Sequence, residues 1–256
     1  MKISDLFKNW PPNTIATSKW LQTMGISRQL LYKYTKSEYI IKVANGCYKK
    51  QGEEVDWTGA LYAVQKQLNL SIYPFGYSAL ELHEYRHHIT MQNKNIIQLS
   101  GAKGEVPPKW LINADFGVEI SYKTSTLFRK KLRNIEQQFR GNYPISVPTP
   151  EVSILQVLED VNDSNSFEDA LNIMENLIGL QLNRMQEAFN ECNSYKVKRL
   201  FLFLAKYTSL PILNDLKYTT EDLGNGVLQI VEHGKYNQEF KIMIPNQFKN
   251  KGDNPF

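Results

Sequence analysis

Cysteine, histidine and long apolar runs are scarce in this chain of 256 residues, which holds two cysteines and four histidines. Cys47 and Cys192 lie far apart in the sequence, which excludes the dense disulfide framework of small secreted domains. The longest apolar run, residues 200–205, is much shorter than the roughly 20 apolar residues that a membrane-spanning helix needs. The first residues also lack the apolar core of a secretory signal. We therefore expect a soluble protein of the cytoplasm.

Common catalytic motifs are missing as well. The chain contains no G-x-S-x-G nucleophile turn, no phosphate-binding P-loop and no G-x-G-x-x-G dinucleotide motif. With 42% hydrophobic and 22% charged residues, it has the composition of a folded protein of one or two domains. We expect a protein without catalytic residues, cofactor or bound metal.

The small net charge of +4 hides an uneven distribution of charge along the chain. Residues 1–50 hold nine Lys and Arg residues but only two acidic ones, Asp5 and Glu38, which gives them a net charge of +7. Residues 51–256 carry a net charge of −3. A basic N-terminal module on a mildly acidic body indicates a partner that is polyanionic at one end only.

Three short helices are predicted within the first fifty residues. The apolar stripe of the first helix, which ends before two prolines, consists of Ile3, Leu6, Phe7 and Trp10. Thr17 or Ser18 caps a second helix, which ends at Gly25. Ser27 caps a third helix that runs to about Ser37. Two helices joined by a glycine turn are typical of a helix-turn-helix.

The third helix has two opposed faces when its residues are placed at ~100° intervals. The apolar face consists of Leu30, Leu31 and Tyr34. The polar face, together with the N-cap, consists of Ser27, Arg28, Gln29, Tyr32, Lys33 and Lys36. Such side chains contact DNA: Arg binds guanine and Gln binds adenine through two hydrogen bonds, and Lys contacts phosphates. We interpret this helix as a recognition helix; the alternative is a solvated face of a protein-interaction module.

A basic β-hairpin is predicted directly after the third helix. Residues 39–43 and 47–50 favour strands, and Asn45-Gly46 is the preferred pair for a type I′ turn. The basic edge and tip of this hairpin consist of Lys42, Asn45, Lys49 and Lys50. Beside a recognition helix, such a wing contacts phosphates or a minor groove. The first fifty residues are therefore predicted to form a winged helix-turn-helix that binds double-stranded DNA.

The rest of the chain predicts an α+β domain. Helices are expected over 56–68, 77–84, 149–161, 166–190 and 196–207, strands over 96–99, 118–122 and 143–147, and a terminal hairpin over 227–231 and 240–244. The predicted fold class is α+β. It has a winged helix-turn-helix domain at 1–50 and a larger domain at 51–256, with a small mixed sheet and a helical segment at 149–210.

Six segments stand in a characteristic order and spacing. They are Gly25-Ile26-Ser27, Asn45-Gly46-Cys47-Tyr48, Ser78-Ala79-Leu80-Glu81-Leu82-His83, Thr149-Pro150-Glu151, Lys198-Arg199-Leu200-Phe201 and Leu223-Gly224-Asn225-Gly226. In this order the chain resembles the AbiEi-like family of type IV abortive-infection antitoxins, although Val152 stands where that family usually has an arginine. The resemblance implies an N-terminal winged domain that represses its own operon at inverted repeats. It also implies a C-terminal domain that counteracts a nucleotidyltransferase-like toxin without forming a stable complex with it.

Two residue constellations keep an enzymatic alternative open. His83, Glu84 and His87 form an H-E-x-x-H pattern, which on one helix would bind zinc and activate a water molecule. Asp222, Glu239 and Lys241 follow the D…E-x-K pattern of magnesium-dependent nucleases, and Glu239 to Lys241 are expected on the last strand. Short patterns of this kind also arise by chance, so the non-enzymatic interpretation is preferred.

A second basic cluster lies in the middle of the chain. It consists of Arg129, Lys130, Lys131 and Arg133. Most charge clusters are solvated surface, but this one could also extend a path for nucleic acid beyond the wing.

Overall fold

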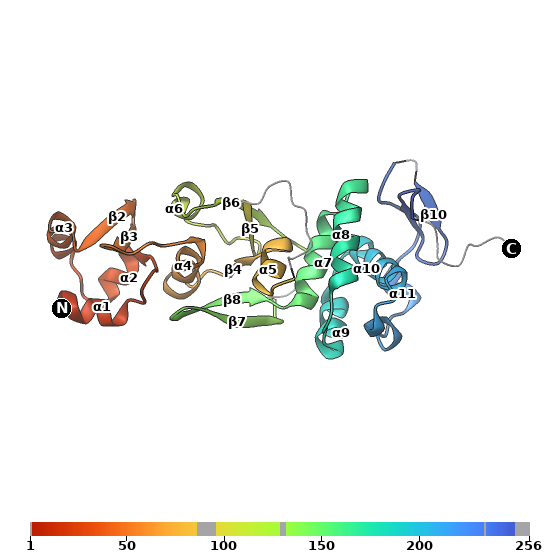
Figure 1. Ribbon diagram of the computed structural model, residues 1–256, viewed down its shortest axis with the longest axis horizontal. Helices are drawn as coiled ribbons and strands as arrows, with labels where there is room; N and C mark the ends of the chain where they lie inside the picture. The colour runs from red at the N-terminus through yellow and green to blue at the C-terminus, as the bar shows by residue number, and fades with distance from the viewer. Residues whose placement is uncertain (1, 86–95, 129–131, 233, 249–256) are drawn as a thin grey trace. The chain divides into compact units, whose positions relative to one another are not determined.

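The computed structural model describes residues 2–85, 96–128, 132–232 and 234–248 (Figure 1). The chain divides into two compact units. Unit 1 comprises Met1–Pro74, Asn93–Ser125 and Ile135–Val147, and unit 2 comprises Phe75–Gln92, Thr126–Asn134 and Pro148–Phe256. The predicted domain boundary at residue 50 is not a boundary between these two units, because the winged region and the small sheets that follow it both belong to unit 1.

Unit 1 begins with the predicted winged helix-turn-helix (Figure 1). Its elements are α1 (Ile3–Asn9), β1 (Ala16–Thr17), α2 (Ser18–Thr23), α3 (Arg28–Lys36), β2 (Ile40–Ala44) and β3 (Cys47–Lys50). The three strands form a sheet in the order β1-β3-β2. The predicted caps are confirmed: the hydroxyl of Thr17 accepts a hydrogen bond from the backbone of Trp20, and that of Ser27 accepts one from Leu30.

A small apolar core holds the winged region together. Its buried members are Leu6, Trp10, Ala16, Leu21, Ile26 and Ile40. The indole N–H of Trp10 is satisfied inside this core, where it donates to the carbonyl oxygen of Thr14 at 3.0 Å. The apolar stripe that predicts the first helix therefore also supplies the contact between that helix and the sheet.

The side chain of Gln67 links the winged region to the next helix, beside a backbone hydrogen bond from Ile15 to Gly59. Its Oε1 accepts a hydrogen bond from the backbone N–H of Thr17, and its Nε2 donates to the carbonyl oxygen of Ile15, both at 2.8 Å. Gln67 ends a π-helical turn, η1 (Ala63–Gln67), which continues α4 (Trp57–Tyr62). Asp56 caps α4 as the sequence predicts, but the change to π-helical geometry carries no recognisable sequence signal.

The remainder of unit 1 consists of two small sheets and a short helix. The elements are β4 (Ile72–Pro74), β5 (Ile96–Gly101), α6 (Lys109–Asn113), β6 (Glu119–Thr124), β7 (Ile135–Arg140) and β8 (Tyr143–Pro148). Strands β4, β5 and β6 form one sheet, and β7 pairs with β8. The expected strands at 96–99, 118–122 and 143–147 are confirmed. The sequence missed β7, whose polar residues occupy both faces, and α6, which is too short to show a helical period.

Unit 2 is mainly helical. Its helices are α5 (Tyr77–Leu82), α7 (Pro150–Asp160), α8 (Ser164–Asn176), α9 (Leu182–Glu191), α10 (Tyr195–Tyr207), the 3-10 turn η2 (Pro211–Asn214) and α11 (Thr220–Leu223). Helix α10 packs against α7 and α8 around an apolar core that both α7 and α10 line along most of their length. The predicted continuous helix over 166–190 is wrong. It is interrupted between Asn176 and Leu182, where Gly179 adopts a φ of +85°.

A three-stranded sheet follows the helices of unit 2. It consists of β9 (Leu228–Gln229), β10 (Lys235–Asn237) and β11 (Ile242–Ile244), in the order β10-β11-β9. The predicted terminal hairpin is wrong in its pairing. Strand β11 runs parallel to β9 and antiparallel to β10. The short polar strand β10 lacks alternating apolar residues, so the sequence does not indicate that β10 is the antiparallel partner of β11. No helix in the described ranges has the length and apolar character needed to cross a membrane.

Candidate nucleic-acid interface

The α3 polar face, which we define as Ser27, Arg28, Gln29, Tyr32, Lys33 and Lys36, is exposed at every one of its residues. Among them, the side chain of Tyr32 is 67% exposed, which is unusual for a large aromatic residue. On the opposite side of the helix, Leu30, Leu31 and Tyr34 pack against the apolar core. The helix thus places its apolar side chains inward and leaves two lysines, an arginine, a glutamine and a tyrosine free to contact a large ligand.

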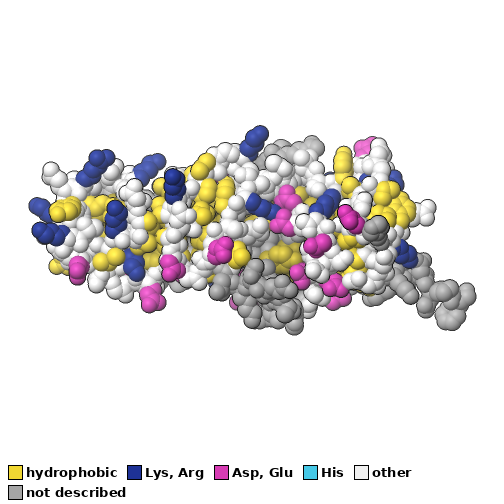
Figure 2. Space-filling model, turned by 90° about the horizontal axis from the view of Figure 1, so that it is seen from above, with side chains coloured by type: hydrophobic (Ala, Val, Ile, Leu, Met, Phe, Trp, Pro, Cys, Tyr) yellow, Lys and Arg dark blue, Asp and Glu magenta, His cyan; other side chains and the backbone are white. Residues whose placement is uncertain are grey.

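The wing is tied to the start of α2. The backbone N–H of Ser18 donates to the carbonyl oxygen of Gly46 at 3.0 Å, and Gly46 adopts a φ of +76° in the turn between β2 and β3. Lys42 and Asn45 are exposed, and Lys49 is partly exposed. In Figure 2, dark blue Lys and Arg side chains are frequent over the N-terminal elements, whereas acidic side chains are frequent over the helices of unit 2.

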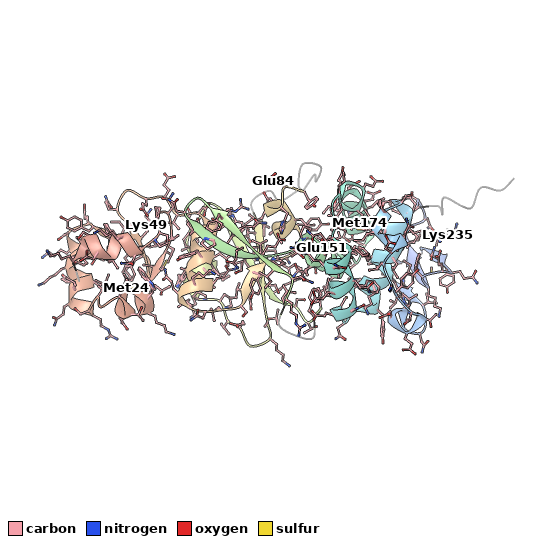
Figure 3. The ribbon with its side chains drawn as sticks, turned by 90° about the horizontal axis from the view of Figure 1, so that it is seen from below. Met24, Lys49, Glu84, Glu151, Met174 and Lys235 are labelled. Atoms are coloured by element: carbon pink, nitrogen blue, oxygen red, sulfur yellow. The ribbon has the colours of Figure 1, made fainter. Side chains whose placement is uncertain are left out.

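Strand alternation separates Lys49 from the other two lysines of the wing, Lys42 and Lys50. Lys42 pairs with Tyr48, and Lys49 pairs with Ile41 on the adjacent position. Successive residues of a strand point to opposite faces, so Lys42 and Lys49 lie on opposite faces of the hairpin. Lys49, labelled in Figure 3, shares its face with Ile41. The wing therefore presents one basic side chain on each face, rather than a single continuous edge.

Lys50 does not belong to the basic edge predicted from the sequence. Only 8% of it is exposed, and its ammonium group binds Oε1 of Glu53 at 3.2 Å. The same ammonium lies 5.6 Å from the ring centroid of Phe7 and 5.7 Å from that of Trp10. Lys50 faces inward because it pairs with Ile40, a core residue. It stabilises the winged region by cation–π contact and ion pairing, and it cannot reach a phosphate.

The second basic cluster is described only in part. Arg129, Lys130 and Lys131 lie outside the described residues. Arg133 is 61% exposed, and its guanidinium lies 4.0 Å from a carboxylate oxygen of Glu187 and 3.8 Å from one of Glu191. The charge of Arg133 is thus partly balanced by the acidic residues of α9.

The H-E-x-x-H pattern does not form a zinc-binding helix. Helix α5 ends at Leu82, and Glu84 has a φ of +66°, which breaks the helical repeat before His87 is reached. His87 itself lies outside the described residues. The Nε2 of His83 donates to the carbonyl oxygen of Pro148 at 2.8 Å, so this ring ties α5 to the start of α7. Within the described ranges no three His, Cys, Asp or Glu side chains are placed to hold a metal ion.

The D…E-x-K residues are held at two different places along α10. Asp222 binds the ammonium of Lys198 at 2.8 Å, whereas Glu239 binds that of Lys206. These lysines are eight positions apart in α10, and this spacing corresponds to a distance of about 12 Å along the helix axis. The expectation that Glu239 and Lys241 lie on the last strand is also wrong, because β11 begins at Ile242. The two carboxylates do not form one magnesium site.

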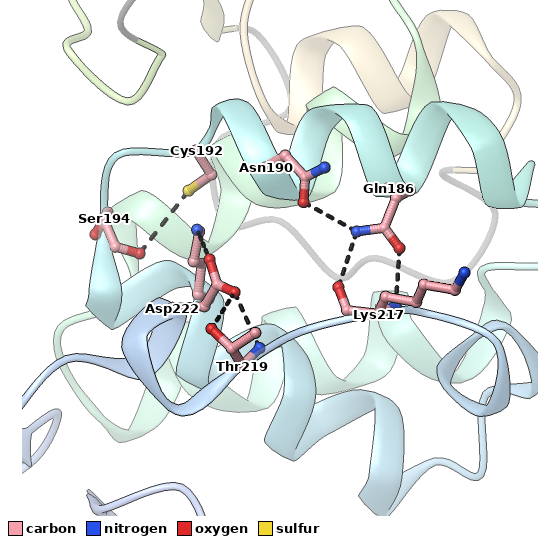
Figure 4. Close-up of polar contacts among 8 residues, drawn as sticks. Gln186, Asn190, Cys192, Ser194, Lys217, Thr219 and Asp222 are labelled. Carbon is pink, nitrogen blue, oxygen red and sulfur yellow. Dashed lines mark hydrogen bonds and ion pairs between the residues drawn. The ribbon is translucent and has the colours of Figure 1, made fainter.

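Both carboxylate oxygens of Asp222 accept hydrogen bonds (Figure 4). Its Oδ1 accepts from Lys198, and its Oδ2 accepts from the backbone N–H and the hydroxyl of Thr219 at 3.0 and 3.1 Å. Partial burial of the carboxylate opposes its ionisation, but the hydrogen bonds from Lys198 and Thr219 outweigh this effect and lower the pKa of Asp222. The lowered pKa keeps the Asp222 carboxylate charged at a lower pH than a free aspartate would be.

Comparison with known protein families decides the identity of the chain. Residues 1–91 match the family model of the AbiEi antitoxin N-terminal domain, and residues 94–245 match that of the transcriptional regulator, AbiEi antitoxin, type IV toxin–antitoxin system. The chain belongs to the AbiEi antitoxin family. The family consists of antitoxins that are transcriptional regulators, in agreement with the resemblance inferred from the sequence.

One solved structure supports the fold of this AbiEi-family chain. The crystal structure of the RV2827C protein from Mycobacterium tuberculosis superimposes with a TM-score of 0.58 at 11% sequence identity, covering 94% of this chain and 89% of that one. At so low an identity the similarity concerns the fold alone. No curated protein sequence matches the chain.

Two segments that carry the AbiEi resemblance meet at a buried guanidinium. Arg199 of α10 is fully buried; its Nε donates to the carbonyl oxygen of Leu223, the last residue of α11, and its Nη1 to that of Gly226 in the following loop. Nη1 also donates to the carbonyl oxygen of Lys241 at 3.0 Å. Burial lowers the pKa of Arg199 from its usual value. From the sequence, the residues around Arg199 predict only a buried helix; its role as an anchor for residues 223–226 needed the structure.

Proposed function

We propose that this AbiEi-family antitoxin binds duplex DNA at the operator of its own operon and represses transcription. The observation that carries the proposal is the α3 polar face, a fully exposed set of base- and phosphate-binding side chains opposite a packed apolar face. A helix-turn-helix places its second helix in the major groove, and the width of that groove admits an α-helix. The adjacent wing adds basic side chains where the phosphate backbone passes.

Individual residues have distinct roles in this proposal. Arg28 and Gln29, in the first turn of α3, read base edges, since Arg binds guanine and Gln binds adenine through paired hydrogen bonds. The remaining contacts to sugar, phosphate and groove walls come from Ser27, Tyr32, Lys33, Lys36, Lys42, Asn45 and Lys49. Two copies of the chain would occupy the two halves of an inverted repeat.

We further propose that unit 2 provides the antitoxin activity against a nucleotidyltransferase-like toxin, without a stable complex between the two proteins. This proposal is supported by the match of residues 94–245 to the AbiEi antitoxin family. The acidic character of residues 151–256 adds a physical argument, because a net negative charge does not favour contact with the phosphate backbone of duplex DNA. The DNA-binding and antitoxin activities are thus assigned to different parts of the chain.

Binding of operator DNA by matched variants tests the DNA-binding proposal. Arg28→Ala should reduce affinity for the operator by about 1–3 kcal/mol and should reduce discrimination against altered base pairs. Lys49→Ala should weaken binding to all sequences by a similar factor and should reduce the salt dependence. Lys217→Ala, which changes an exposed lysine of unit 2, serves as the control and should leave binding unchanged. Equal binding by all four proteins would contradict the proposal.

A further inference from the structure

A polar pocket of about 550 Å³ opens in unit 2 between the end of α9, the start of α10 and α11. The residues that matter for its chemistry are Asn190, Glu191, Tyr195, Lys198, Glu221 and Asp222. Volumes of this size are typical of small-ligand sites. The proposed DNA interface is made entirely by residues of unit 1, and so this pocket is a separate feature.

One wall of the pocket is the aromatic ring of Tyr195, which packs on the backbone of Gly224. A Cβ atom built on Gly224 would lie 3.0 Å from ring atoms of Tyr195, which shows how closely the ring lies on the glycine backbone. Tyr195 is nevertheless 54% exposed, so its other side is open. Arg199 fixes this arrangement by binding the carbonyl oxygens of Leu223 and Gly226, on either side of the glycine. The result is a rigid platform for stacking of a planar ring.

The floor of the pocket offers hydrogen-bond donors. The side chain of Lys198 is only 8% exposed, and its Nζ donates a single hydrogen bond, to Asp222, among the residues that the structure describes. An ammonium group has three N–H donors; the Nζ of Lys198 also lies 5.0 Å from the centroid of the Phe189 ring, and a donor that faces neither Asp222 nor this ring can bind a ligand. The side-chain oxygen of Asn190 accepts from Gln186 at 2.9 Å, which leaves the amide N–H₂ group of Asn190 to donate (Figure 4).

The rim of the pocket offers acceptors. Glu221 is exposed, and its carboxylate makes no hydrogen bond or ion pair with any residue in the described part of the chain. Asp222 is saturated by Lys198 and Thr219 and is not available. The pocket therefore combines a stacking surface, a carboxylate with two adjacent acceptors, the buried ammonium of Lys198 and the exposed amide of Asn190.

We propose that this pocket binds the guanine base of a nucleoside, a nucleotide or an unpaired RNA residue. Guanine carries two adjacent donors, N1–H and N2–H₂, which match the two oxygens of one carboxylate, and beside them the acceptor O6, which matches an ammonium or amide donor. Unpaired bases are recognised in this way, by stacking on aromatic rings and by hydrogen bonds to their edges. Recognition of an anion by charge alone is disfavoured, since three carboxylates line the pocket and Lys198 is its single cation among the lining residues, so the base is the group that the pocket recognises.

Calorimetric titration of the full chain with the four ribonucleosides tests the proposal. Guanosine should bind at least about tenfold more tightly than adenosine, cytidine or uridine, because only guanine pairs two donors with Glu221. Glu221→Gln should weaken guanosine binding about tenfold, whereas Glu175→Gln, a matched change on the exposed part of α8, should have no effect. Tyr195→Ala should weaken it about tenfold and Tyr195→Phe should not, because stacking needs the ring and not the hydroxyl.

Further arms identify the source of the base and separate this inference from the proposed function. A single-stranded RNA hexamer with one guanine that binds more tightly than guanosine, and loses this advantage in Glu221→Gln, would identify RNA as the source. If guanosine or its monophosphate binds more tightly than the hexamer, the source of the base is a free nucleoside or nucleotide. Arg28→Ala should change neither result, so failure of DNA binding leaves this test intact. Equal binding of all four nucleosides, or none at millimolar concentration, with folding of each variant verified by circular dichroism, would overturn the proposal.

Discussion

The Nη1 of Arg199 lies 2.8 Å from the carbonyl oxygen of Gly226 and donates a hydrogen bond to it. The guanidinium is fully buried, and no carboxylate of the described residues lies within ion-pair range. Its charge is instead solvated by backbone carbonyl dipoles from residues 223–226 and 241. Because these carbonyls lie far apart in sequence from α10, this one side chain fixes the course of the chain between α11 and β11.

Replacement of Arg199 is therefore expected to be strongly destabilising. Arg199→Met keeps an unbranched apolar stem but leaves several buried carbonyl groups without donors, and we expect a loss of about 3 kcal/mol in the free energy of unfolding. Arg133→Met removes an exposed guanidinium with weak ion pairs and should cost less than about 1 kcal/mol. Urea denaturation followed by far-UV circular dichroism, which reports the helices of unit 2, compares the two variants, and equal effects would contradict the role assigned to Arg199.

The Lys198–Asp222 ion pair predicts a specific loss of stability in acid. The folded-state pKa of Asp222 is lowered, so its contribution is present above the unfolded-state pKa of about 3.9 and is lost as the pH falls through the folded-state value. Between about pH 5 and pH 3, the stability of Asp222→Asn should fall less steeply than that of the wild type. Parallel curves of unfolding free energy against pH would show that Asp222 does not contribute in this way.

Lys49 and Lys50 are adjacent in sequence but should respond differently to mutation. Lys50→Met keeps the apolar stem between Phe7 and Trp10 and removes the ion pair to Glu53, at a cost of about 1–3 kcal/mol in stability. At a temperature where this variant is folded, its affinity for operator DNA should equal that of the wild type. Lys49→Ala should show the reverse pattern, with normal stability and weaker DNA binding. Equal losses of DNA affinity in both variants would contradict the burial of Lys50.

Gln67 is expected to be important for the attachment of the winged region. Gln67→Leu has a similar volume but leaves the backbone N–H of Thr17 and the carbonyl oxygen of Ile15 buried without partners, which should cost about 1–3 kcal/mol. Gln22→Leu, on the exposed side of α2, is the control. Hydrogen exchange at the amide of Thr17 should become faster in Gln67→Leu and remain slow in the control; unchanged exchange would count against this attachment.

The sequence predicts best those elements whose signals are local. Ser27, Gly25 and the alternation of apolar and polar residues define α3 and its two faces, and Asn45-Gly46 defines the wing. The inward position of Lys50 depends on its strand pairing with Ile40, which composition does not show. The parallel pairing of β9 with β11 is likewise a long-range contact, because residues 228 and 242 meet only when the whole loop between them is in place.

The candidate sites illustrate the same limit. The H-E-x-x-H pattern suggests a helix through His87, but the left-handed conformation of Glu84 ends that repeat. Asp222 and Glu239 look like partners in sequence, yet each is bound by a different lysine of α10. The pocket beside Tyr195 could not be predicted, since it requires two other segments, the end of α9 and residues 219–222, to converge on α10.

The affinity of the wild-type chain for its own operator is the most direct test of the account. It should be measured by fluorescence anisotropy at about 0.15 M salt, with the promoter duplex and a shuffled duplex of the same length and composition. Specific protein–DNA complexes exceed non-specific ones by roughly 10³-fold or more, and we predict a preference of that size for the promoter. Equal affinity for the two duplexes would contradict the claim that α3 reads DNA sequence.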